Sequence, residues 1–348
     1  MKTGTRDDHD VTDPPSSALS DACTARDGRI HRPLDRSARV FVAGKSGLVG
    51  SAVWRRLRRE GFSDLVGPRS AELDLRERRA VLGWFAAARP NVVVVAAARV
   101  GGIKANASRP AEFLSENLRI QVNVLDAALK HGVQRLLFLG SSCIYPKFAE
   151  QPIREEALLT GHLEPTNDAY AIAKIGGILQ VQAVRRQYGL PWISAMPTNL
   201  YGPGDNFHPE HSHVLPSLIR RFHEAKESAA RSVVNWGSGS PRREFLHVDD
   251  LARACLHLLE HYDADSPVNV GTGTDLTIHE LTQLVADVVG YQGSIEWDRE
   301  QPDGTPRKLL DVSRLTALGW APRIGLREGI SQTYAWYVKN LESGTLRH

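Results

Sequence analysis

The sequence predicts an α/β protein: a doubly wound parallel sheet with a smaller, interleaved C-terminal α/β lobe. Three observations support this prediction. From Arg39 onward, short apolar runs alternate with amphipathic segments, as in buried parallel strands separated by helices. A glycine-rich loop directly follows the first apolar run. After about Asn199 the alternation gives way to loops rich in Gly and Pro, which indicates a second lobe.

The first part of the chain contains the strands and helices of the predicted sheet. Strands are expected at the short apolar runs Val40–Ala43, Val92–Ala96, Leu136–Leu139 and Trp192–Met196, with a weaker strand near Leu65. Helices are expected at the amphipathic segments Leu48–Glu60, Arg76–Ala88, Ala111–Lys130, Ala169–Tyr188 and Leu215–Lys226. Farther along, we expect strands at Val233–Trp236 and Val268–Val270 and a helix at Ile278–Val289.

These patterns divide the chain into three parts. Residues 1–36 are rich in Asp, Thr, Ser and Pro without periodicity, so we expect a disordered N-terminal extension. Residues 37–200, with a returning segment at about 245–272, form the predicted sheet domain. Residues 201–244 and 273–348 form the predicted substrate-binding lobe.

Composition and charge argue against several classes of protein. The formal net charge is +3, and 43 Lys and Arg are interspersed with 40 Asp and Glu, so nucleic acid is not an expected partner. No stretch reaches the roughly 18 consecutive apolar residues of a membrane span, and no signal peptide is evident. Three widely spaced cysteines, Cys23, Cys143 and Cys255, argue against a disulfide framework. We therefore expect a cytoplasmic protein with no membrane partner.

The glycine-rich loop Gly44–Gly50 lies between the first strand and the helix after it. Glycines at this point let the backbone approach a pyrophosphate, whose charge is stabilised by the free N–H groups at the helix N-terminus. The alternative is an ordinary tight turn between a strand and a helix. The spacing GxxGxxG resembles the extended short-chain dehydrogenase/reductase superfamily, which has a Rossmann sheet.

A second group of polar residues follows the strand that ends at Leu139. Ser141 lies at the carboxyl edge of the predicted sheet, where ligands bind in such folds. Tyr170 and Lys174 are four residues apart, so on a helix they share a face, and the ammonium is expected to lower the pKa of the phenol. Without other evidence, Tyr170 and Lys174 could equally be two neighbouring surface residues with no catalytic role. With Ser141, the pair points to the reduction of a carbonyl.

Cys143 adds chemistry that a simple reductase does not need. Many cysteines are inert core residues, but this one lies two residues after Ser141, where a thiolate can remove a proton from a carbon beside a ketone. A second group must return a proton, and a short segment offers His208, His211 and His213. If that segment is extended, His211 and His213 point one way and His208 the other, and the sequence alone selects none of them. A metal site is the alternative, but no Cys or carboxylate cluster accompanies the histidines, and we expect no metal.

Longer strings give a more specific resemblance. They are Ala97–Ile103, Leu137–Lys147, Met196–Pro203, Arg243–Asp250 and Pro302–Asp311. On these strings the chain, from Arg39 to about Asn340, resembles the GDP-L-fucose synthases. Members of this family epimerise C3 and C5 of GDP-4-keto-6-deoxy-D-mannose and then reduce C4 with NADPH.

The resemblance implies a role for each group. Cys143 would be the epimerising base and His213 the opposing acid. Tyr170 would protonate O4 as hydride reaches C4, with Ser141 holding that oxygen and Lys174 binding the nicotinamide ribose. Contacts to the GDP-sugar are implied for Arg221, Trp236, Arg243 and Asp303. Contacts to the cofactor are implied for Gly44, Lys45, Ser46, Gly47, Leu48, Val49, Gly50, Arg69, Ser70, Asp74, Leu75, Leu139, Gly140, Ser141, Ser142, Lys174, Pro197, Thr198, Asn199, Leu200 and His213. The resemblance also implies a homodimer built from helices of the NADP-binding Rossmann domain.

NADPH is the expected cofactor, although one feature departs from the family. Where the family usually has arginines that meet the 2′-phosphate, this chain has Ser46 and Ser70, and Lys45 and Arg69 lie one residue away. Against NAD, the segment 67–70 lacks the carboxylate that would bind a free ribose hydroxyl.

Two other functions fit parts of the same pattern. One is another sugar-nucleotide 4-epimerase, 4-reductase or 4,6-dehydratase of the superfamily, but a dehydratase carries a carboxylate pair where this chain has Cys143 and Ile144. The other is a non-catalytic NADP-sensing module. Such a module is expected to have a damaged Tyr and Lys pair, and here both residues are intact.

Overall fold

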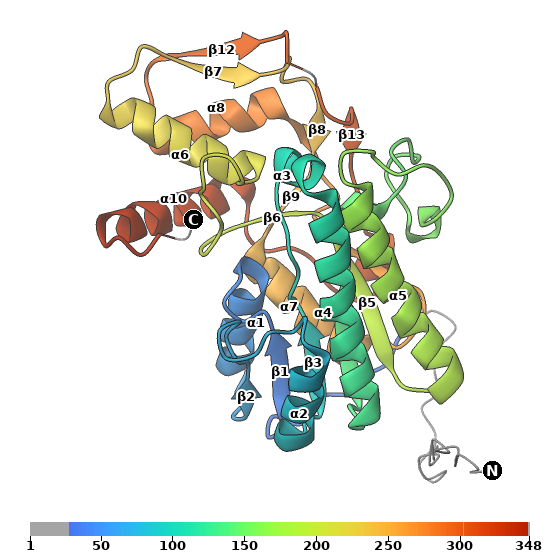
Figure 1. The fold of residues 1–348 in the computed structure, drawn as a ribbon. Coiled ribbons are helices and arrows are strands. Elements are labelled where there is room, and N and C mark those ends of the chain that lie inside the picture. Colours follow the sequence, from blue (N-terminus) through green and yellow to red (C-terminus); the bar gives the residue numbers. More distant parts are fainter. Residues whose placement is uncertain (1–27, 302, 347–348) are drawn as a thin grey trace, which may run out of the picture.

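The computed structural model describes residues 28–301 and 303–346. Residues 1–27, most of the predicted extension, lie outside the described residues. The described chain has a larger lobe around a parallel sheet and a smaller lobe at the carboxyl ends of its strands (Figure 1). Among the described residues, no helix is both long enough and apolar enough to cross a bilayer.

The larger lobe is built on a six-stranded parallel sheet in the order β10-β5-β4-β3-β1-β2. Its strands are β1 (Val40–Ala43), β2 (Leu65–Val66), β3 (Val92–Val95), β4 (Arg135–Leu139), β5 (Trp192–Pro197) and β10 (Val268–Val270). All residues of β1, β3 and β4 are buried, which explains why they are apolar apart from Arg135 at the start of β4. Because β2 and β3 flank β1 on opposite sides, the order of the strands reverses at β1, and ligands bind at the carboxyl edge beside such a point in sheets of this kind. The predicted doubly wound parallel sheet is confirmed.

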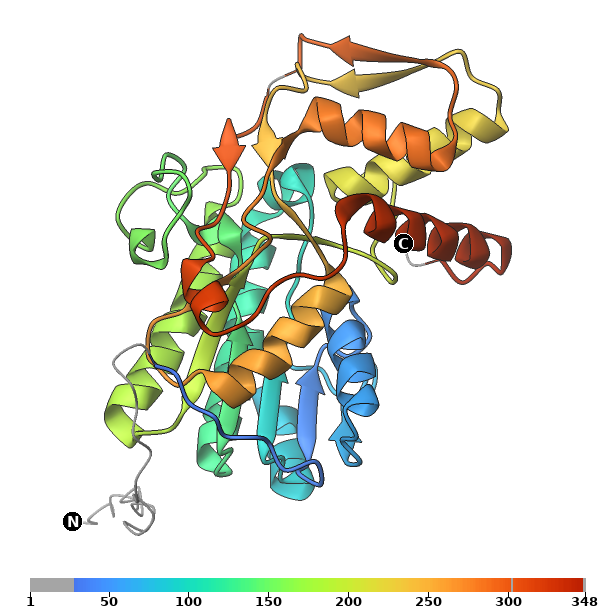
Figure 2. The same cartoon turned by 180° about the vertical axis from the view of Figure 1, so that it is seen from behind.

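Helices cover both faces of this sheet. On one face lie α1 (Leu48–Arg59) and α7 (Val248–His261). On the other lie α2 (Arg78–Ala88), α4 (Pro110–Lys130) and α5 (Asp168–Tyr188). Alternate strand residues supply the two cores, so Val40 and Val42 pack with α1 while Phe41 and Ala43 pack on the opposite face. In Figure 2, which views the molecule from behind, α7 crosses in front of the sheet.

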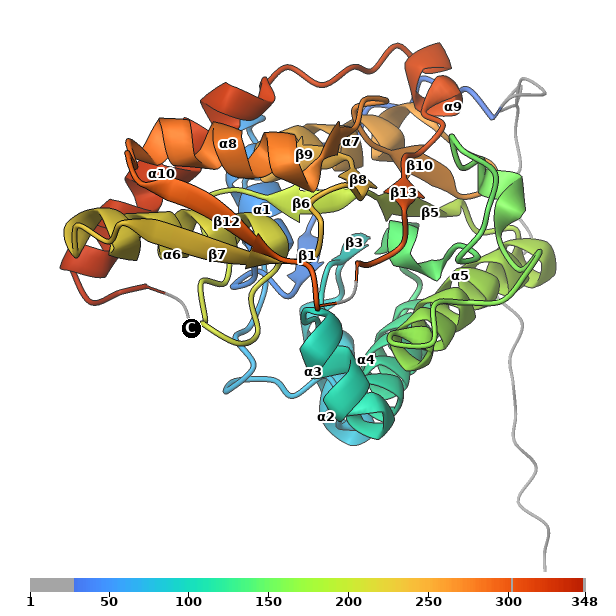
Figure 3. The same cartoon turned by 90° about the horizontal axis from the view of Figure 1, so that it is seen from above.

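The smaller lobe has its own core. It contains α6 (Val214–Glu227), α8 (Ile278–Val289), α10 (Leu326–Glu342) and the parallel pair β7 (Ser232–Trp236) and β12 (Ser294–Asp298). Their apolar faces meet around Phe222, Leu281 and Ile330. In Figure 3 these elements lie to one side of the view, beside the carboxyl edge of the large sheet.

Short elements connect the two lobes. Three strands form a small sheet in the order β11 (Leu276–Thr277), β8 (Arg242–Arg243) and β13 (Arg307–Lys308). A second short sheet pairs β6 (Asn199–Tyr201) with β9 (Phe245–His247). The remaining elements are α3 (Ile103–Ser108), α9 (Ser313–Ala317) and the 3₁₀ turns η1 (Ser142–Ile144) and η2 (Glu155–Ala157).

The expected strands and helices lie within about two residues of their predicted bounds, a usual uncertainty at element ends. The sequence prediction overlooked two long helices, α7 and α10. Helix α10 buries only Gly329, Ile330, Thr333 and Tyr337, so few apolar residues mark its inner face. The connecting sheets pair over only two or three residues, which is too short for a periodic signal in the sequence.

The prediction of disorder is wrong for residues 28–36. Backbone N–H groups of Ile30 and Arg32 donate to the carbonyls of His261 and Glu260 at 3.1 and 2.9 Å. These carbonyls belong to the last turn of α7, where helix carbonyls have no partner within the helix. The polar segment is therefore held by backbone hydrogen bonds, which its composition does not reveal.

Candidate functional site

The glycine-rich loop passes close to itself at the start of α1. Gly44 has φ +84°, a left-handed conformation that favours glycine. A Cβ on Gly50 would lie 2.1 Å from the Gly44 carbonyl oxygen, so only glycine fits there. No side chain caps the first turn of α1, and no acidic residue lies in it. The loop thus has uncapped N–H groups at the start of α1 and no side chains at its glycines, which are the features that a pyrophosphate site needs.

The residues expected at the 2′-phosphate lie near one another. The Lys45 side chain passes beside Gly67, and its Nζ lies 5.0 Å from the centre of the Trp54 ring. The Arg69 guanidinium is exposed and donates to Glu72 at 2.9 and 3.1 Å. This carboxylate, three residues after Arg69, was missed by the sequence analysis. Ser46 and Ser70 are exposed in the same region.

Lys174 is buried beneath the carboxyl end of β4. Its ammonium donates to the Leu139 carbonyl at 2.8 Å and lies 4.9 Å from the Phe138 ring centre. Burial lowers the pKa of Lys174 to about 8. The position at the strand end agrees with the expected edge of the sheet.

The expectation that Lys174 lowers the pKa of Tyr170 is wrong in this structure. Burial raises the pKa of Tyr170, and negative charge on Cys143 raises it further. A hydrogen bond with Ser141 has the opposite, weaker effect. Tyr170 is therefore held as a protonated phenol, the form that can donate a proton.

Cys143 lies in η1, directly after β4. The Ser141 hydroxyl caps this turn by accepting the Cys143 N–H at 3.2 Å. The Cys143 thiol is 3.7 Å from the Lys308 ammonium. Burial alone would raise the pKa of Cys143, but Lys308, a hydrogen bond with Ser141 and the charge of Arg243 together lower it. The site thus favours a thiolate.

Lys308 is the functional residue that the sequence analysis missed. It lies in the string Pro302–Asp311, which was recognised only as part of the resemblance. Its partner in the small sheet is Arg243, since β13 and β8 pair in parallel with Lys308 opposite Arg243. Only this register brings two cations from distant parts of the chain to the thiol.

The histidine segment is a turn rather than an extended strand. His208 and His211 stack with ring centres 4.5 Å apart, and the Ser212 N–H donates to the His208 carbonyl at 3.2 Å. The expectation that His211 and His213 point the same way required an extended segment, and this segment is not extended. His213 is the N-cap of α6, and it is exposed.

Residues expected along the cofactor also include the ends of β5 and β2. Thr198 and Asn199 follow β5, and their side chains donate to the Glu244 carbonyl at 3.3 and 2.8 Å. Asp74 pairs with Arg76 at 2.8 Å. The other members are Leu75, Gly140, Ser142, Pro197 and Leu200, which are buried or half-buried.

The expected substrate residues come from the smaller lobe and its connecting strands. Arg221 donates to the Asn235 side chain at 2.9 Å and also to the Val234 carbonyl. Trp236 ends β7 with 71% of its surface exposed, so its indole face is open to a ligand. The Asp303 carboxylate accepts from the backbone and hydroxyl of Ser238 at 2.9 and 2.6 Å.

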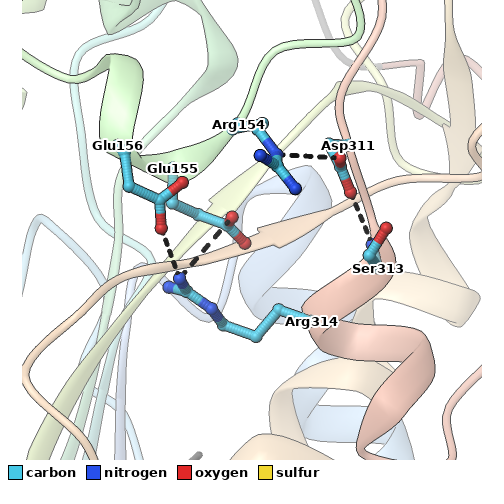
Figure 4. Close-up of a pocket in the computed structure, with 6 residues that line it drawn as sticks. All are labelled: Arg154, Glu155, Glu156, Asp311, Ser313 and Arg314. Atoms are coloured by element: carbon cyan, nitrogen blue, oxygen red, sulfur yellow. Dashed lines mark hydrogen bonds and ion pairs between the residues drawn. The ribbon is translucent and has the colours of Figure 1, made fainter.

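Two other features lie outside this group. Within the part of the chain that the structure describes, no three His, Cys, Asp or Glu side chains gather into a metal site. A pocket of about 270 Å³ is lined by Arg154, Glu155, Glu156, Asp311, Ser313 and Arg314 (Figure 4). Its charged groups pair with one another, and it contains none of the residues expected to be catalytic.

The chain has clear relatives. Residues 40–271 match the model of the NAD dependent epimerase/dehydratase family. The chain is 60% identical to GDP-L-fucose synthase 1 of Arabidopsis thaliana, over 88% of this chain and 95% of that protein. It is 53% identical to GDP-L-fucose synthase of Escherichia coli, over 87% and 97%.

Solved structures agree with this relationship. A GDP-L-fucose synthetase from Naegleria fowleri bound to NADP superimposes with a TM-score of 0.85 at 29% identity, covering 92% of this chain and 98% of that one. A GDP-mannoheptose C4 reductase from Campylobacter jejuni, also with NADP bound, gives 0.81 at 34% identity, covering 88% and 99%. The chain belongs to the NAD dependent epimerase/dehydratase family and, within it, to the GDP-L-fucose synthases.

Proposed function

We propose that this protein converts GDP-4-keto-6-deoxy-D-mannose to GDP-L-fucose by epimerising C3 and C5 and then reducing C4 with NADPH. The observation that supports both activities is the pairing of Cys143 with Lys308 beside Ser141 and Tyr170. A simple reductase needs the last two residues but not a stabilised thiolate. The high identity to GDP-L-fucose synthases favours this substrate over other GDP-sugars.

In the epimerase half, the Cys143 thiolate removes a proton from C3 or C5, which the C4 ketone makes acidic. Lys308 and Arg243 stabilise the thiolate before this step. His213 then gives a proton to the opposite face of the carbon. The negative charge that develops on O4 is stabilised by the hydroxyls of Ser141 and Tyr170, which act as an oxyanion site.

In the reductase half, Tyr170 donates its phenolic proton to O4. Its raised pKa keeps that proton in place until O4 becomes basic. NADPH, when bound, supplies the hydride for C4. Lys174, held by the Leu139 carbonyl at the strand end, is placed to bind the nicotinamide ribose. Ser141 serves both halves, so one ketone-binding pair supports two reactions.

We infer that the glycine-rich loop holds the pyrophosphate of NADPH. Gly44 and Gly50 lie too close together for any side chain between them, and no side chain caps the N-terminus of α1, so its N–H groups can bind an anion. Lys45 and Arg69 are the cations nearest the expected 2′-phosphate. Arg69 is held by Glu72, so the phosphate would compete with this carboxylate or share the guanidinium with it.

We propose that residues 201–244 and 273–348 act as the substrate-binding lobe, with the rest of the described chain holding the cofactor. Arg221 and Arg243 are suited to a pyrophosphate, and the exposed Trp236 indole to a base or sugar. Burial lowers the pKa of both arginines, which indicates that their charges have little water around them. An anionic ligand would compensate for this loss of hydration.

The test is to mix purified protein with GDP-4-keto-6-deoxy-D-mannose and NADPH in deuterated water and to examine the product by proton NMR. GDP-L-fucose with deuterium at C3 and C5 is the expected result. A 6-deoxy sugar of unchanged configuration and without deuterium would reduce the proposal to a simple 4-reductase. No oxidation of NADPH at all would favour the sensing module.

We also propose a homodimer and a cytoplasmic location. Val122 on α4 and Ile172 and Leu179 on α5 are exposed apolar side chains on two helices that pack together, and a second copy would cover them. Free thiols at Cys143 and Cys255 suit a reducing compartment.

A further inference from the structure

Glu244 is a buried carboxylate with no place among the residues considered so far. None of its surface is exposed. One carboxylate oxygen accepts the N–H groups of Thr272 and Gly273 at 2.6 and 2.7 Å, and the other accepts the Leu310 N–H at 3.2 Å. A Cβ on Gly271 would lie 2.3 Å from this carboxylate, so the chain is closely wrapped around it. A buried charge needs such partners, and here three are backbone N–H groups, joined by the Thr272 hydroxyl at 3.3 Å.

These three N–H groups come from the segments that carry the small sheet. Glu244 directly follows β8. Thr272 and Gly273 begin the loop that leads to β11, and Leu310 lies two residues after Lys308 in β13. One carboxylate, on the residue after β8, therefore binds the loop before β11 and the segment after β13, and each of these strands is only two residues long. In Figure 3, β8 and β13 lie close together beside the carboxyl edge of the large sheet.

The chain after Lys308 is held from the other side as well. The Leu309 N–H donates to the Gln151 side chain at 2.9 Å, and the Asp311 N–H donates to the Ile153 carbonyl at 2.8 Å. In Figure 4 the Asp311 carboxylate accepts from Ser313 and faces Arg154 at 3.5 Å. These contacts fix the direction of the segment, but they all lie beyond Lys308. On the side of β8, the Asp275 carboxylate accepts from Arg242 at 3.0 Å and from Arg307, just before Lys308, at 2.5 Å. Glu244 holds the chain just after Lys308 through the Leu310 N–H.

We propose that Glu244 is a positioning residue that holds β13 against β8, and thereby keeps the Lys308 ammonium beside the Cys143 thiol. The distance from ammonium to sulfur is 3.7 Å, short enough for a strong charge effect that weakens quickly if the strand moves. Glu244 touches neither reacting group. It acts through Lys308, and this proposal rests on the proposed role of Cys143 as the base.

The substitution Glu244→Gln tests this geometry with little change in volume. An amide has one accepting oxygen and one donating nitrogen, so the NH₂ group would face the N–H of Leu310 or those of Thr272 and Gly273. Donor would then oppose donor, and one of the strands would have to move away. Glu244→Asp keeps the charge but shortens the reach by one methylene group, so it should give a smaller effect.

The readout is the pH dependence of Cys143 alkylation by iodoacetamide in the full-length protein, with the modified peptide quantified by mass spectrometry. Only the thiolate reacts, so the midpoint reports the thiol pKa without any substrate. Glu244→Gln is expected to raise the midpoint by about one unit, and Lys308→Met by a similar amount. The double variant is expected to show no further rise, because both changes remove the same contact.

The matched control is Asp250→Asn. Asp250 is also fully buried and accepts two backbone N–H groups, from Arg323 and Ile324, at 2.8 Å each. The Asp250→Asn variant should lower thermal stability as Glu244→Gln does, yet leave the pH midpoint of Cys143 alkylation unchanged. An unchanged midpoint in Glu244→Gln, an equal shift in Asp250→Asn, or additive shifts in the double variant would each overturn the proposal. If Glu244→Gln does not fold, an unshifted midpoint in Glu244→Asp would overturn it.

The alkylation result is independent of the reaction assigned above. A shifted midpoint together with failure to form GDP-L-fucose would keep the positioning role and remove the proposed function. An unchanged midpoint together with normal product formation would remove the positioning role of Glu244 and keep the proposed function.

Discussion

Adding one methyl group at Gly50 is expected to damage cofactor binding more than it damages the fold. The new Cβ would lie 2.1 Å from the Gly44 carbonyl oxygen and 2.5 Å from its carbon, and both are backbone atoms that no rotamer change can move. Ordinary contact begins near 3.4 Å, so the two segments must separate by about 1.3 Å (3.4 − 2.1). Overpacking of this kind costs about 1–3 kcal/mol, offset by the roughly 1 kcal/mol that alanine gains over glycine in a helix.

We therefore expect a net loss of stability of about 0–2 kcal/mol, or up to roughly 3 °C in Tm for a chain of this size. Losing one backbone hydrogen bond to a charged phosphate costs about 1.5–3 kcal/mol, which corresponds to about a ten- to hundredfold rise in Kd for NADPH. Thermal unfolding and the fluorescence of bound NADPH measure the two effects.

Gly83→Ala is the matched control, since this exposed glycine in α2 has nothing within 4 Å of an added Cβ. It is expected to raise stability by about 0.5–1 kcal/mol and to leave NADPH binding unchanged. If Gly50→Ala is as stable as Gly83→Ala and binds NADPH as tightly as the parent, the reasoning from close approach is refuted.

Four further predictions concern the site and the assembly. Cys143→Ser is expected to abolish deuterium exchange at C3 and C5, measured by NMR, with NADPH binding retained; full exchange in this variant would remove the base assignment. In the parent, burial opposes ionisation of the thiol but Lys308 lowers its pKa overall, so exchange should rise with pH to a midpoint below the ordinary 9.0; a midpoint above that value contradicts the site geometry. Arg69→Ala is expected to raise KM for NADPH about tenfold more than KM for NADH, and equal changes would exclude a contact with the 2′-phosphate. Ile172→Glu is expected to convert a dimer to monomers in sedimentation, because it places a charge on the exposed apolar face of α5; an unchanged dimer would place the interface elsewhere.

The reductase half of the site was accessible to sequence reasoning because its geometry is local. Ser141 follows a strand that is visible as an apolar run, and Tyr170 and Lys174 are one helical turn apart. Each relation depends on regular secondary structure, so spacing along the chain fixes position in space. The spacing did not predict the protonation state of Tyr170, because that state depends on burial and on the charge of Cys143, both of which raise its pKa.

The environment of Cys143 was not accessible in the same way. Lys308 and Arg243 lie on strands of two residues, which have no periodicity to detect. Their meeting at the thiol depends on the pairing of β13 with β8, and we infer that the buried Glu244 helps to hold that pairing. Sequence strings identified the segments as similar to a family, but the contact itself is a property of the folded chain.

This division follows the chemistry of the two reactions. Hydride reduction needs a proton donor and an oxygen-binding hydroxyl at the edge of the cofactor sheet, and any protein with this sheet can supply them from β4 and α5. Epimerisation needs a thiolate in a buried place, where a charge is stable only beside cations. At this edge of the large sheet, the ammonium of Lys174 is bound to the Leu139 carbonyl and burial lowers its pKa. The cations must therefore come from the connecting strands, so epimerase activity should be more sensitive than reductase activity to changes that loosen the contact between the two lobes.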